Sequence, residues 1–272
     1  MKVTDFEGKN VYIVGGSSGI GFAAAELLAE EGSNVIIFAR GRERLEEALE
    51  RIGGRRKGDA QRFAFKQLDI AEHEEVDRVM GEAVEEFGPP DILINSAGRA
   101  LPDYFENVSY EQFDRSMKIH AYGNWNAIKS LLPHLKQRRG YIVNVCSMLG
   151  FMGVFGYSDY CASKFALMGL TEVLKSELKP HKVGISILCP PDTDTPGFEV
   201  ENRNKPPETV AVSESGGLLQ PEEVAEAMLK GMRKGKFLIG PGPAGTIYYL
   251  KRFLPWLVDM VMDRDIRKAR ER

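Results

Sequence analysis

The chain is poor in the features that mark metal-binding, disulfide-rich and nucleic-acid-binding proteins. Only three of its 272 residues are cysteines, and their spacing fits no metal-ligand motif. We therefore expect no bound metal, and we expect reduced thiols at Cys146, Cys161 and Cys189, as is usual in a reducing compartment. The formal net charge is only -3 at pH 7, so no overall positive field attracts nucleic acid.

Long uninterrupted apolar segments are missing as well. Residues 1–9 form a short polar segment, unlike a signal peptide. The sequence also has no internal repeat of the length found in solenoid proteins. The composition is that of a soluble globular protein, with 43% apolar and 28% charged residues. A length of 272 residues suits one doubly wound domain with an added cap, so we expect a single hydrophobic core.

Short apolar runs of the kind that form buried parallel strands recur along the chain, with helical patterns between nearly all of them. This alternation, with right-handed crossovers, predicts an α/β fold with a doubly wound, Rossmann-like parallel sheet and helices on both faces. Ligands of such sheets bind beyond the carboxyl ends of the strands. The runs cover residues 11–14, 35–38, 63–68, 92–94, 141–145 and 185–188.

The first of these runs ends in a glycine-rich turn, V-Y-I-V-G-G-S-S-G-I-G, and a helical pattern follows at residues 22–31. Without a Cβ atom, Gly15, Gly19 and Gly21 permit a tight turn, a close approach of phosphates to the amides, and close packing of helix on strand. The helix N-terminus adds unpaired N–H groups and the positive end of the helix dipole. The pattern predicts a dinucleotide pyrophosphate site.

The end of the second run, V-I-I-F-A-R, indicates which dinucleotide is bound. An acidic residue at this place hydrogen-bonds a free ribose 2′-hydroxyl, whereas a cation pairs with a 2′-phosphate. Here the residue is Arg40, followed by Arg42 and Arg44. A guanidinium can bind the phosphate with two hydrogen bonds, so we predict NADP(H). The alternative is that these arginines form the exposed first turn of the next helix, which we expect for at least Arg42.

A pair of residues in the middle of the chain points to proton transfer. Tyr160 is the only tyrosine with a lysine four residues later, and on a helix Tyr160 and Lys164 would share a face. We expect the lysine ammonium to lower the tyrosine pKa below its usual value of about 10, which would make Tyr160 an acid near neutral pH. Ser147 follows the run 141–145 and could hold a substrate oxygen. The alternatives are a surface tyrosine and a helix-capping serine.

These motifs together resemble the short-chain dehydrogenase/reductase family over roughly residues 8–240. The matching parts are Gly15-x-x-x-Gly19-x-Gly21, Asn95-Ser96-Ala97-Gly98, Ser147 and Tyr160-x-x-x-Lys164, in the family's order and spacing. The resemblance implies that hydride comes from the nicotinamide ring, that Tyr160 protonates the carbonyl oxygen, and that Lys164 holds the nicotinamide ribose. The cofactor-binding residues expected from the motifs and the resemblance are Gly15, Ser17, Ser18, Gly19, Ile20, Gly21, Arg40, Arg44, Asp69 (at the adenine), Asn95, Ala97, Gly98, Tyr160, Lys164, Pro190, Thr193 and Thr195.

Residues 190–219 are rich in Pro, Thr, Glu and Gly, and we interpret them as a mobile substrate lid. The run P-P-D-T-D-T-P-G-F at residues 190–198 continues to Glu201-Asn202 and Lys205-Pro206. This stretch is similar to that of the reductases of 3-keto sphingoid bases, whose substrate is a long-chain 3-ketone with a neighbouring amine. The alternative is a generic lid in which Thr193 or Thr195 binds only the nicotinamide amide.

His120 departs from the family pattern, in which an asparagine usually completes a proton relay. A histidine there could preserve the helix bend, relay the proton itself, or merely pack. We expect backbone support first and direct proton transfer second.

The C-terminal residues 246–272 form an amphipathic tail. Apolar side chains recur at helical spacing, basic residues follow, and Pro255 should kink the helix. Charged residues interrupt the stretch before it reaches the roughly 20 residues that span a bilayer, so it fits the surface of a membrane better. Packing on the chain's own lid or in a dimer interface is the alternative. The apolar positions are Ile247, Leu250, Leu254, Leu257 and Val261, with Trp256 among them.

We therefore expect one reductase domain over residues 1–245 that uses NADPH to reduce a 3-keto sphingoid base. Alternatives are a reductase of another lipophilic ketone, such as a 3-oxoacyl thioester or a steroid, and a non-catalytic NADP(H)-sensing regulator. The expected location is cytoplasmic, or peripheral on a membrane, which in a eukaryote would be the cytosolic face of the endoplasmic reticulum. The family resemblance also implies a homo-oligomer, paired through helices around residues 113–132 and 157–177.

Overall fold

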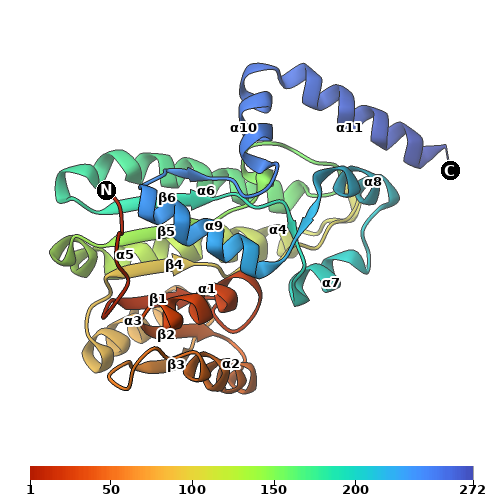
Figure 1. Cartoon of the computed structure of the whole chain (residues 1–272). Coiled ribbons are helices and arrows are strands. Elements are labelled where there is room, and N and C mark those ends of the chain that lie inside the picture. Colours follow the sequence, from red (N-terminus) through yellow and green to blue (C-terminus); the bar gives the residue numbers. More distant parts are fainter. Residues whose placement is uncertain (272) are drawn as a thin grey trace.

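The computed structural model describes residues 1–271, apart from the side chain of residue 215, and in this part of the chain seven parallel strands form one sheet (Figure 1). The order β3-β2-β1-β4-β5-β6-β9 reverses direction between β1 and β4, which confirms the predicted doubly wound topology. The strands are β1 (Asn10–Val14), β2 (Asn34–Ala39), β3 (Phe63–Gln67), β4 (Ile92–Asn95), β5 (Tyr141–Val145), β6 (Gly184–Leu188) and β9 (Leu238–Ile239).

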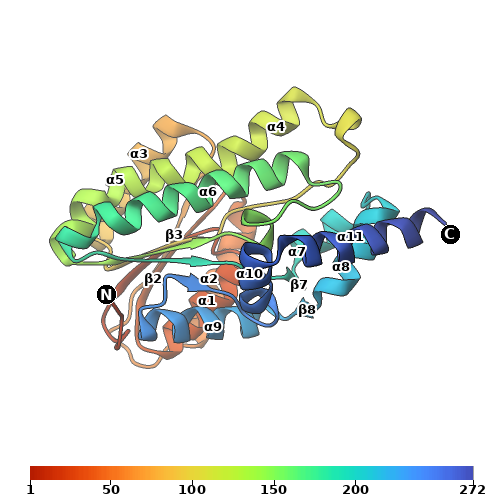
Figure 2. The ribbon, with the colours of Figure 1, turned by 90° about the horizontal axis from the view of Figure 1, so that it is seen from above.

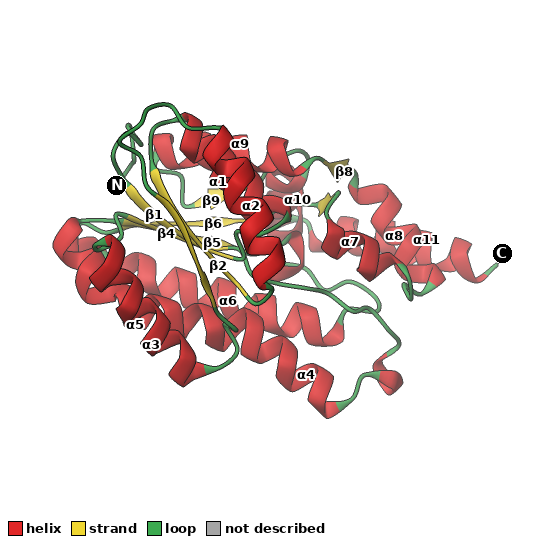
Figure 3. Ribbon diagram, turned by 90° about the horizontal axis from the view of Figure 1, so that it is seen from below, coloured by secondary structure: helices red, strands yellow, loops and turns green. Residues whose placement is uncertain are grey.

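Helices cover both faces of this sheet, as Figures 2 and 3 show from above and below. One layer contains α1 (Gly19–Glu30), α2 (Arg42–Gly54) and α9 (Pro221–Lys234). The other contains α3 (His73–Phe87), α5 (Gly123–Arg138) and α6 (Ser158–Glu177), with α4 (Tyr110–Met117) joined to α5 through a π-helical turn, Lys118–Tyr122. Short 3-10 helices lie at Phe105–Asn107, Met148–Gly150 and Lys179–His181.

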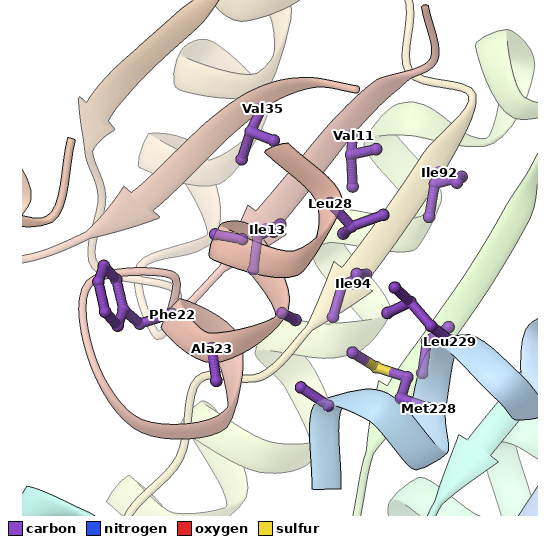
Figure 4. Packing of buried hydrophobic residues seen from close by; sticks show 14 of the residues in the cluster. Val11, Ile13, Phe22, Ala23, Leu28, Val35, Ile92, Ile94, Met228 and Leu229 are labelled. Carbon is purple, nitrogen blue, oxygen red and sulfur yellow. The ribbon is translucent and has the colours of Figure 1, made fainter. Parts of the chain in front are cut away.

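The strands are buried on both faces, because alternate side chains enter different layers. Val11 and Ile13 of β1 pack with Leu28 of α1 and Met228 of α9 in the cluster drawn in Figure 4. Tyr12, between the two β1 residues, belongs to the cluster on the opposite face. Fully burying one such aliphatic side chain stabilises a fold by about 1.5–3 kcal/mol, which explains why near-continuous apolar runs predict these strands.

All six predicted runs are strands whose bounds differ by at most one residue from the prediction. Three further strands were not predicted from the sequence. β9 extends the sheet by pairing Leu238 with Ile187, and β7 (Asp192–Thr193) and β8 (Leu218–Leu219) form a small separate pair. Each of these strands has only two residues, too few to produce a recognisable apolar run.

Two segments of the C-terminal third lie beyond the carboxyl edge of the sheet, residues 190–219 and residues 244–270 (Figure 1). Residues 190–219 contain β7, α7 (Pro196–Asn202), α8 (Pro207–Gly216) and β8, and the tail forms α10 (Ala244–Phe253) and α11 (Pro255–Arg270). Pro255 begins a new helix after a break at Leu254, and α11 packs along α8.

The break changes which tail residues face the protein. Ile247 of the predicted stripe packs against the buried Met148 and Met152, and so do Val258 and Met262, which lie outside the stripe. The stripe residues Leu254 and Val261 are exposed. The predicted stripe assumed one continuous helical phase, which the break at Leu254 interrupts. None of the helices in the described part of the chain has the length and apolar character needed to cross a membrane.

Candidate active site

A groove crosses the carboxyl edge of the sheet, where the loops after several parallel strands meet. Two adjoining hollows form it and share residues of the glycine turn and of the loop after β4, including Gly15, Ser17 and Gly98. The first hollow is lined by Ser147, Tyr160 and Lys164, and the second extends to the end of β2. The other sequence-predicted residues along the groove are Ser18, Gly19, Ile20, Arg40, Arg44, Asp69, Ala97, Pro190, Thr193 and Thr195.

The glycine turn fits an anion at the start of α1. Gly15 has φ +80°, and a Cβ atom there would lie 2.5 Å from the Ala97 nitrogen, so the two loops touch only because residue 15 is glycine. Ser18 precedes the helix in an extended conformation without capping it through its side chain, and the first turn of α1 holds no acidic residue. The free amides of this turn and the helix dipole therefore remain available to a pyrophosphate.

Two residues expected at the cofactor lie behind the groove instead. Gly21 is packed against the turn, because a Cβ atom there would lie 2.3 Å from the Gly15 oxygen. Asn95 is the last residue of β4, is 3% exposed, and donates from Nδ2 to Asn144 Oδ1 at 3.0 Å. The Asn95 side chain joins β4 to β5, and the loop after it reaches the groove, so a role of Asn95 at the cofactor stays a prediction.

Six charged residues line the second hollow: Arg40, Arg42, Glu43, Arg44, Asp69 and Arg99. Arg40 and Arg44 are exposed at its wall, whereas Arg42 pairs with Glu46 at 2.8 Å in the first turn of α2, as expected for a solvated helix start. Asp69 accepts a hydrogen bond from Arg115 at 2.5 Å. Burial raises the pKa of Asp69, but the Arg115 hydrogen bond and the Ala71 amide outweigh burial, so its pKa is lowered and it carries a negative charge at neutral pH.

The proposed proton-transfer residues come together in the first hollow. Tyr160 and Lys164 lie in the first two turns of α6, and the Lys164 ammonium donates to the Val145 carbonyl at 3.0 Å. Ser147 follows β5 and caps a 3-10 turn, with its hydroxyl accepting from the Leu149 amide at 3.2 Å. Ser147 therefore caps a short helix, as the alternative interpretation expected, and it also lines the same hollow as Tyr160.

The expected lowering of the Tyr160 pKa is wrong. Burial raises the pKa of Tyr160 well above its usual value, the negative charge of Glu201 raises it further, and a hydrogen bond with Ser147 only partly opposes these effects. Lys164 is itself buried, which lowers its own pKa, and its ammonium is bonded to a carbonyl rather than to the phenol. A raised pKa keeps Tyr160 a neutral phenol, which is the form that donates a proton.

His120 lies in the π-helical turn and is fully buried, outside the lining of the groove. Its Nε2 accepts from the Arg99 amide at 3.2 Å, so Nδ1 carries the proton and donates to Ser163 Oγ at 2.8 Å. Ser163 in turn donates to the Tyr160 carbonyl at 2.7 Å. Burial, with the Lys164 charge, lowers the pKa of His120 well below its usual value. A neutral histidine bonded to two elements of the site favours backbone support over proton transfer.

Three polar residues of the first hollow were not identified as site residues from the sequence. Tyr157, Asp192 and Glu201 line it together with Tyr160. The available signal was that Asp192 and Glu201 both belong to the stretch that resembles the reductases of 3-keto sphingoid bases. Asp192 and Glu201 are far from Tyr160 in the sequence. Glu201 reaches the hollow of Tyr160 only because α7 folds over the sheet edge, which the sequence pattern does not show.

Comparison with known proteins identifies the family. Residues 9–206 match the family described as short chain dehydrogenase. The chain belongs to this family. A short chain dehydrogenase is an oxidoreductase, and curated relatives of this one carry reductase names. The 3-dehydrosphinganine reductase of Danio rerio is 37% identical over 90% of this chain and 74% of its own length, and the 3-ketodihydrosphingosine reductase of Bos taurus is 38% identical over 88% and 72%.

Solved structures confirm the short chain dehydrogenase fold. A family member from Burkholderia phymatum in complex with NAD has a TM-score of 0.81 and 22% identity, and the match covers 92% of this chain and 95% of that one. An alcohol dehydrogenase from Thermococcus sibiricus complexed with 5-hydroxy-NADP has a TM-score of 0.71 and 27% identity, over 82% of this chain and 90% of that one.

Proposed function

We propose that this chain is an NADPH-dependent reductase that converts 3-ketodihydrosphingosine to dihydrosphingosine. The observation that carries the proposal is the meeting of Ser147, Tyr160 and Lys164 in one hollow that continues into the anion site of α1. The substrate follows from the names of relatives 37% and 38% identical to the chain. The reductase domain would cover residues 1–245, with residues 190–219 acting as the lid.

The chain's own groups would orient the ketone and supply the proton. The bound cofactor supplies a hydride to the carbonyl carbon. Ser147 hydrogen-bonds the carbonyl oxygen and holds it against the Tyr160 hydroxyl, which donates its proton as negative charge develops on that oxygen. Lys164, buried beneath the groove, fixes the cofactor ribose and lies 5.4 Å from the centre of the Tyr160 ring, where its charge stabilises the phenolate left after donation.

The second hollow supports NADP(H) over NAD(H). Arg40 and Arg44 offer two exposed guanidinium groups at the end of β2, and Gly41 before α2 leaves the first amides of that helix without a side-chain cap. A ribose 2′-phosphate placed there would gain charge-assisted hydrogen bonds.

A substrate panel tests the function. NADPH oxidation is followed with 3-ketodihydrosphingosine, a 3-oxoacyl thioester and a steroid ketone, each at matched concentration. We expect kcat/KM to be highest for the sphingoid ketone. A higher kcat/KM for either of the other ketones would make that ketone the proposed substrate. NADPH binding without turnover of any ketone would instead support a non-catalytic NADP(H)-sensing regulator.

We also propose that the enzyme acts at a membrane surface through its tail. Tyr249 and Phe253 of α10 and Trp256 and Met260 of α11 are 52–71% exposed, although their helices pack on the protein through other side chains. Arg252, Arg267 and Lys268 are exposed on the same two helices. An apolar face with neighbouring cations suits an anionic lipid surface. Location on the cytosolic side of a membrane follows from this proposal.

A homo-oligomer is a separate proposal. Tyr122 and Trp125 lie at or near the start of α5, and Phe165 and Val173 lie on α6, and all four are 43–54% exposed. Large apolar side chains exposed along two neighbouring helices suit pairing with a second copy. Light scattering after gel filtration tests this, with Trp125→Glu and Phe165→Glu expected to give monomers.

A further inference from the structure

A partly buried carboxylate lines the reacting end of the groove and has no catalytic role in the family's proton-transfer scheme. Glu201 is in α7, lines the same hollow as Ser147 and Tyr160, and its side chain is 15% exposed. It accepts a hydrogen bond from the Tyr157 hydroxyl and pairs with the Lys205 ammonium at 3.1 Å. The Tyr157 and Tyr160 rings are 5.9 Å apart, so one aromatic ring links Glu201 to the proton donor.

Both of these contacts are made by Glu201 Oε1. Among residues whose side chains the structure describes, no hydrogen bond reaches Oε2. The carboxylate therefore keeps one oxygen for a ligand, in a hollow where water is partly excluded. An ionised carboxylate in such a place is stable only with enough cationic or hydrogen-bonding partners.

The charges around Glu201 do not balance. Lys205 is buried, with a side chain 2% exposed, and serves two carboxylates, since its ammonium is also 3.9 Å from Asp192 Oδ2. Asp192 accepts from Ser213 and lines the same hollow. Of the other cations there, Lys164 is bonded to the Val145 carbonyl. Arg99 lines both hollows, but the carboxylates whose charges act on it are Asp159 and Asp69, not Glu201 or Asp192. Two carboxylates share one ammonium, so this wall of the hollow lacks one positive charge.

In a 3-keto sphingoid base the carbon that carries the amine is bonded directly to the carbonyl carbon. A ketone oxygen held by Ser147 and Tyr160 therefore places the ammonium next to the reacting centre. We propose that Glu201, supported by Asp192, binds this ammonium and so selects 2-amino-3-ketones over ketones without an amine. The inference rests on the proposed function and assigns the substrate's charged group to a residue.

Binding of the ammonium would also assist the chemistry. The charge of Glu201 raises the pKa of Tyr160 and so opposes formation of the phenolate that proton donation leaves behind. A bound ammonium neutralises that charge. The correct substrate therefore brings with it the cation that makes Tyr160 a better donor, and a ketone without an amine does not.

The test compares two ketones and two variants. Glu201→Gln keeps the shape of the side chain and removes its charge, and Glu199→Gln removes an exposed carboxylate from the same helix as a matched control. We measure kcat/KM for 3-ketodihydrosphingosine and for the same chain with hydrogen in place of the amine. E201Q should lower the ratio of the two values about 10- to 100-fold, the size of one charge-assisted hydrogen bond, and E199Q should leave it unchanged. A ratio in E201Q within threefold of the wild type overturns the proposal.

A binding measurement separates this proposal from the substrate assignment. The full chain is titrated with both ketones by calorimetry. If the wild type reduces neither ketone but binds the amino ketone more tightly, and E201Q loses that preference, the proposed function fails and the ammonium site stands. If E201Q shows no thermal unfolding transition, the variant is not folded and the wild-type titrations alone test the proposal. Equal affinity of the wild type for the two ketones then overturns the ammonium site.

Discussion

At the scale of single residues, Tyr160 gives the sharpest prediction. Tyr160→Phe removes the proton donor and keeps the ring that packs edge-on against His120 at 5.1 Å. We expect kcat to fall at least about 100-fold, with NADPH affinity nearly unchanged, because acid catalysis contributes about that much. Steady-state kinetics and a fluorescence titration measure the two effects. A variant that keeps more than roughly a tenth of wild-type turnover contradicts the assignment.

The direction of the Tyr160 pKa shift predicts the pH dependence of ketone reduction. A donor whose pKa is raised stays protonated as pH rises through the usual tyrosine value of about 10. The reductive kcat should therefore show no loss from Tyr160 ionisation between pH 7 and about 9.5, as measured with saturating NADPH. A loss of kcat centred near pH 8 would mean that Tyr160 has a lowered pKa in the working complex.

Arg40 decides the choice of cofactor in our proposal. Arg40→Asp replaces the expected phosphate partner with a carboxylate that suits a ribose hydroxyl. The ratio of kcat/KM with NADPH to that with NADH should fall at least about tenfold. Arg42→Asp loses the surface pair with Glu46 and the contact of the guanidinium with the Phe65 ring at 5.9 Å, and it should change the ratio much less. An unchanged ratio in the Arg40 variant would make Arg40 a solvated helix-start residue.

Side-chain spacing identified Ser147, Tyr160 and Lys164 because their chemistry depends on local geometry, a strand end and one helix turn. Glu201 could not be found in the same way, since α7 brings it to Tyr160 from a distant part of the chain. The pKa of Tyr160 was also misjudged. The pattern Tyr-x-x-x-Lys gives proximity in a helix, but burial and the Glu201 charge depend on the assembled fold.

At the scale of elements, the turn between β1 and α1 predicts how two glycines respond to alanine. In Gly15→Ala the new Cβ atom would lie 2.5 Å from the Ala97 nitrogen. The alanine would also have to adopt the left-handed backbone conformation of Gly15, with φ +80°. We expect lower stability and at least about tenfold weaker NADPH binding, because the anion site loses its shape. Gly53→Ala in α2 is the control: nothing lies within 4 Å of its Cβ position, and it should stabilise the protein by about 0.5–1 kcal/mol. Thermal unfolding and cofactor titration measure both variants, and normal cofactor affinity in Gly15→Ala would contradict the assigned role of the turn.

The strands that form long apolar runs were predicted from the sequence. The two-residue strands, which exist only because distant segments pair in the fold, were not. The six long strands follow from apolar runs that bury both faces of a parallel sheet. β9 exists because residues after α9 meet the free edge of β6, and β7 pairs with β8 across residues 194–217. The tail pattern correctly indicated a helix interrupted at Pro255. Before the break the stripe residue Ile247 packs on the protein, but after it Val258 and Met262 pack in place of the stripe residue Val261.

At the scale of the whole molecule, the exposed face of the tail predicts membrane binding. The double variant Phe253→Glu and Trp256→Glu changes two exposed side chains and leaves the packed residues in place. We expect it to abolish co-sedimentation with vesicles of phosphatidylcholine and phosphatidylserine, while reduction of a short soluble ketone continues.

Phe105→Glu, at an 80% exposed site in another part of the chain, is the control and should bind vesicles normally. If the wild-type protein ignores vesicles, the peripheral-membrane proposal is withdrawn. If the double variant instead loses its oligomeric state, the tail face is an interface between copies.

The tail and the substrate hollow share one scaffold. α11 packs along α8, and Arg270 of α11 pairs with Glu208 of α8 at 3.0 Å, in the same segment that carries Glu201. Withdrawing a hydrocarbon chain of roughly 15 carbons from a bilayer would cost about 12 kcal/mol at about 0.8 kcal/mol per methylene. With the tail resting on lipid beside the groove, only the polar head of the ketone has to rise to Tyr160, and the chain can stay dissolved in the bilayer. Most of that extraction work would then never have to be done during a catalytic cycle.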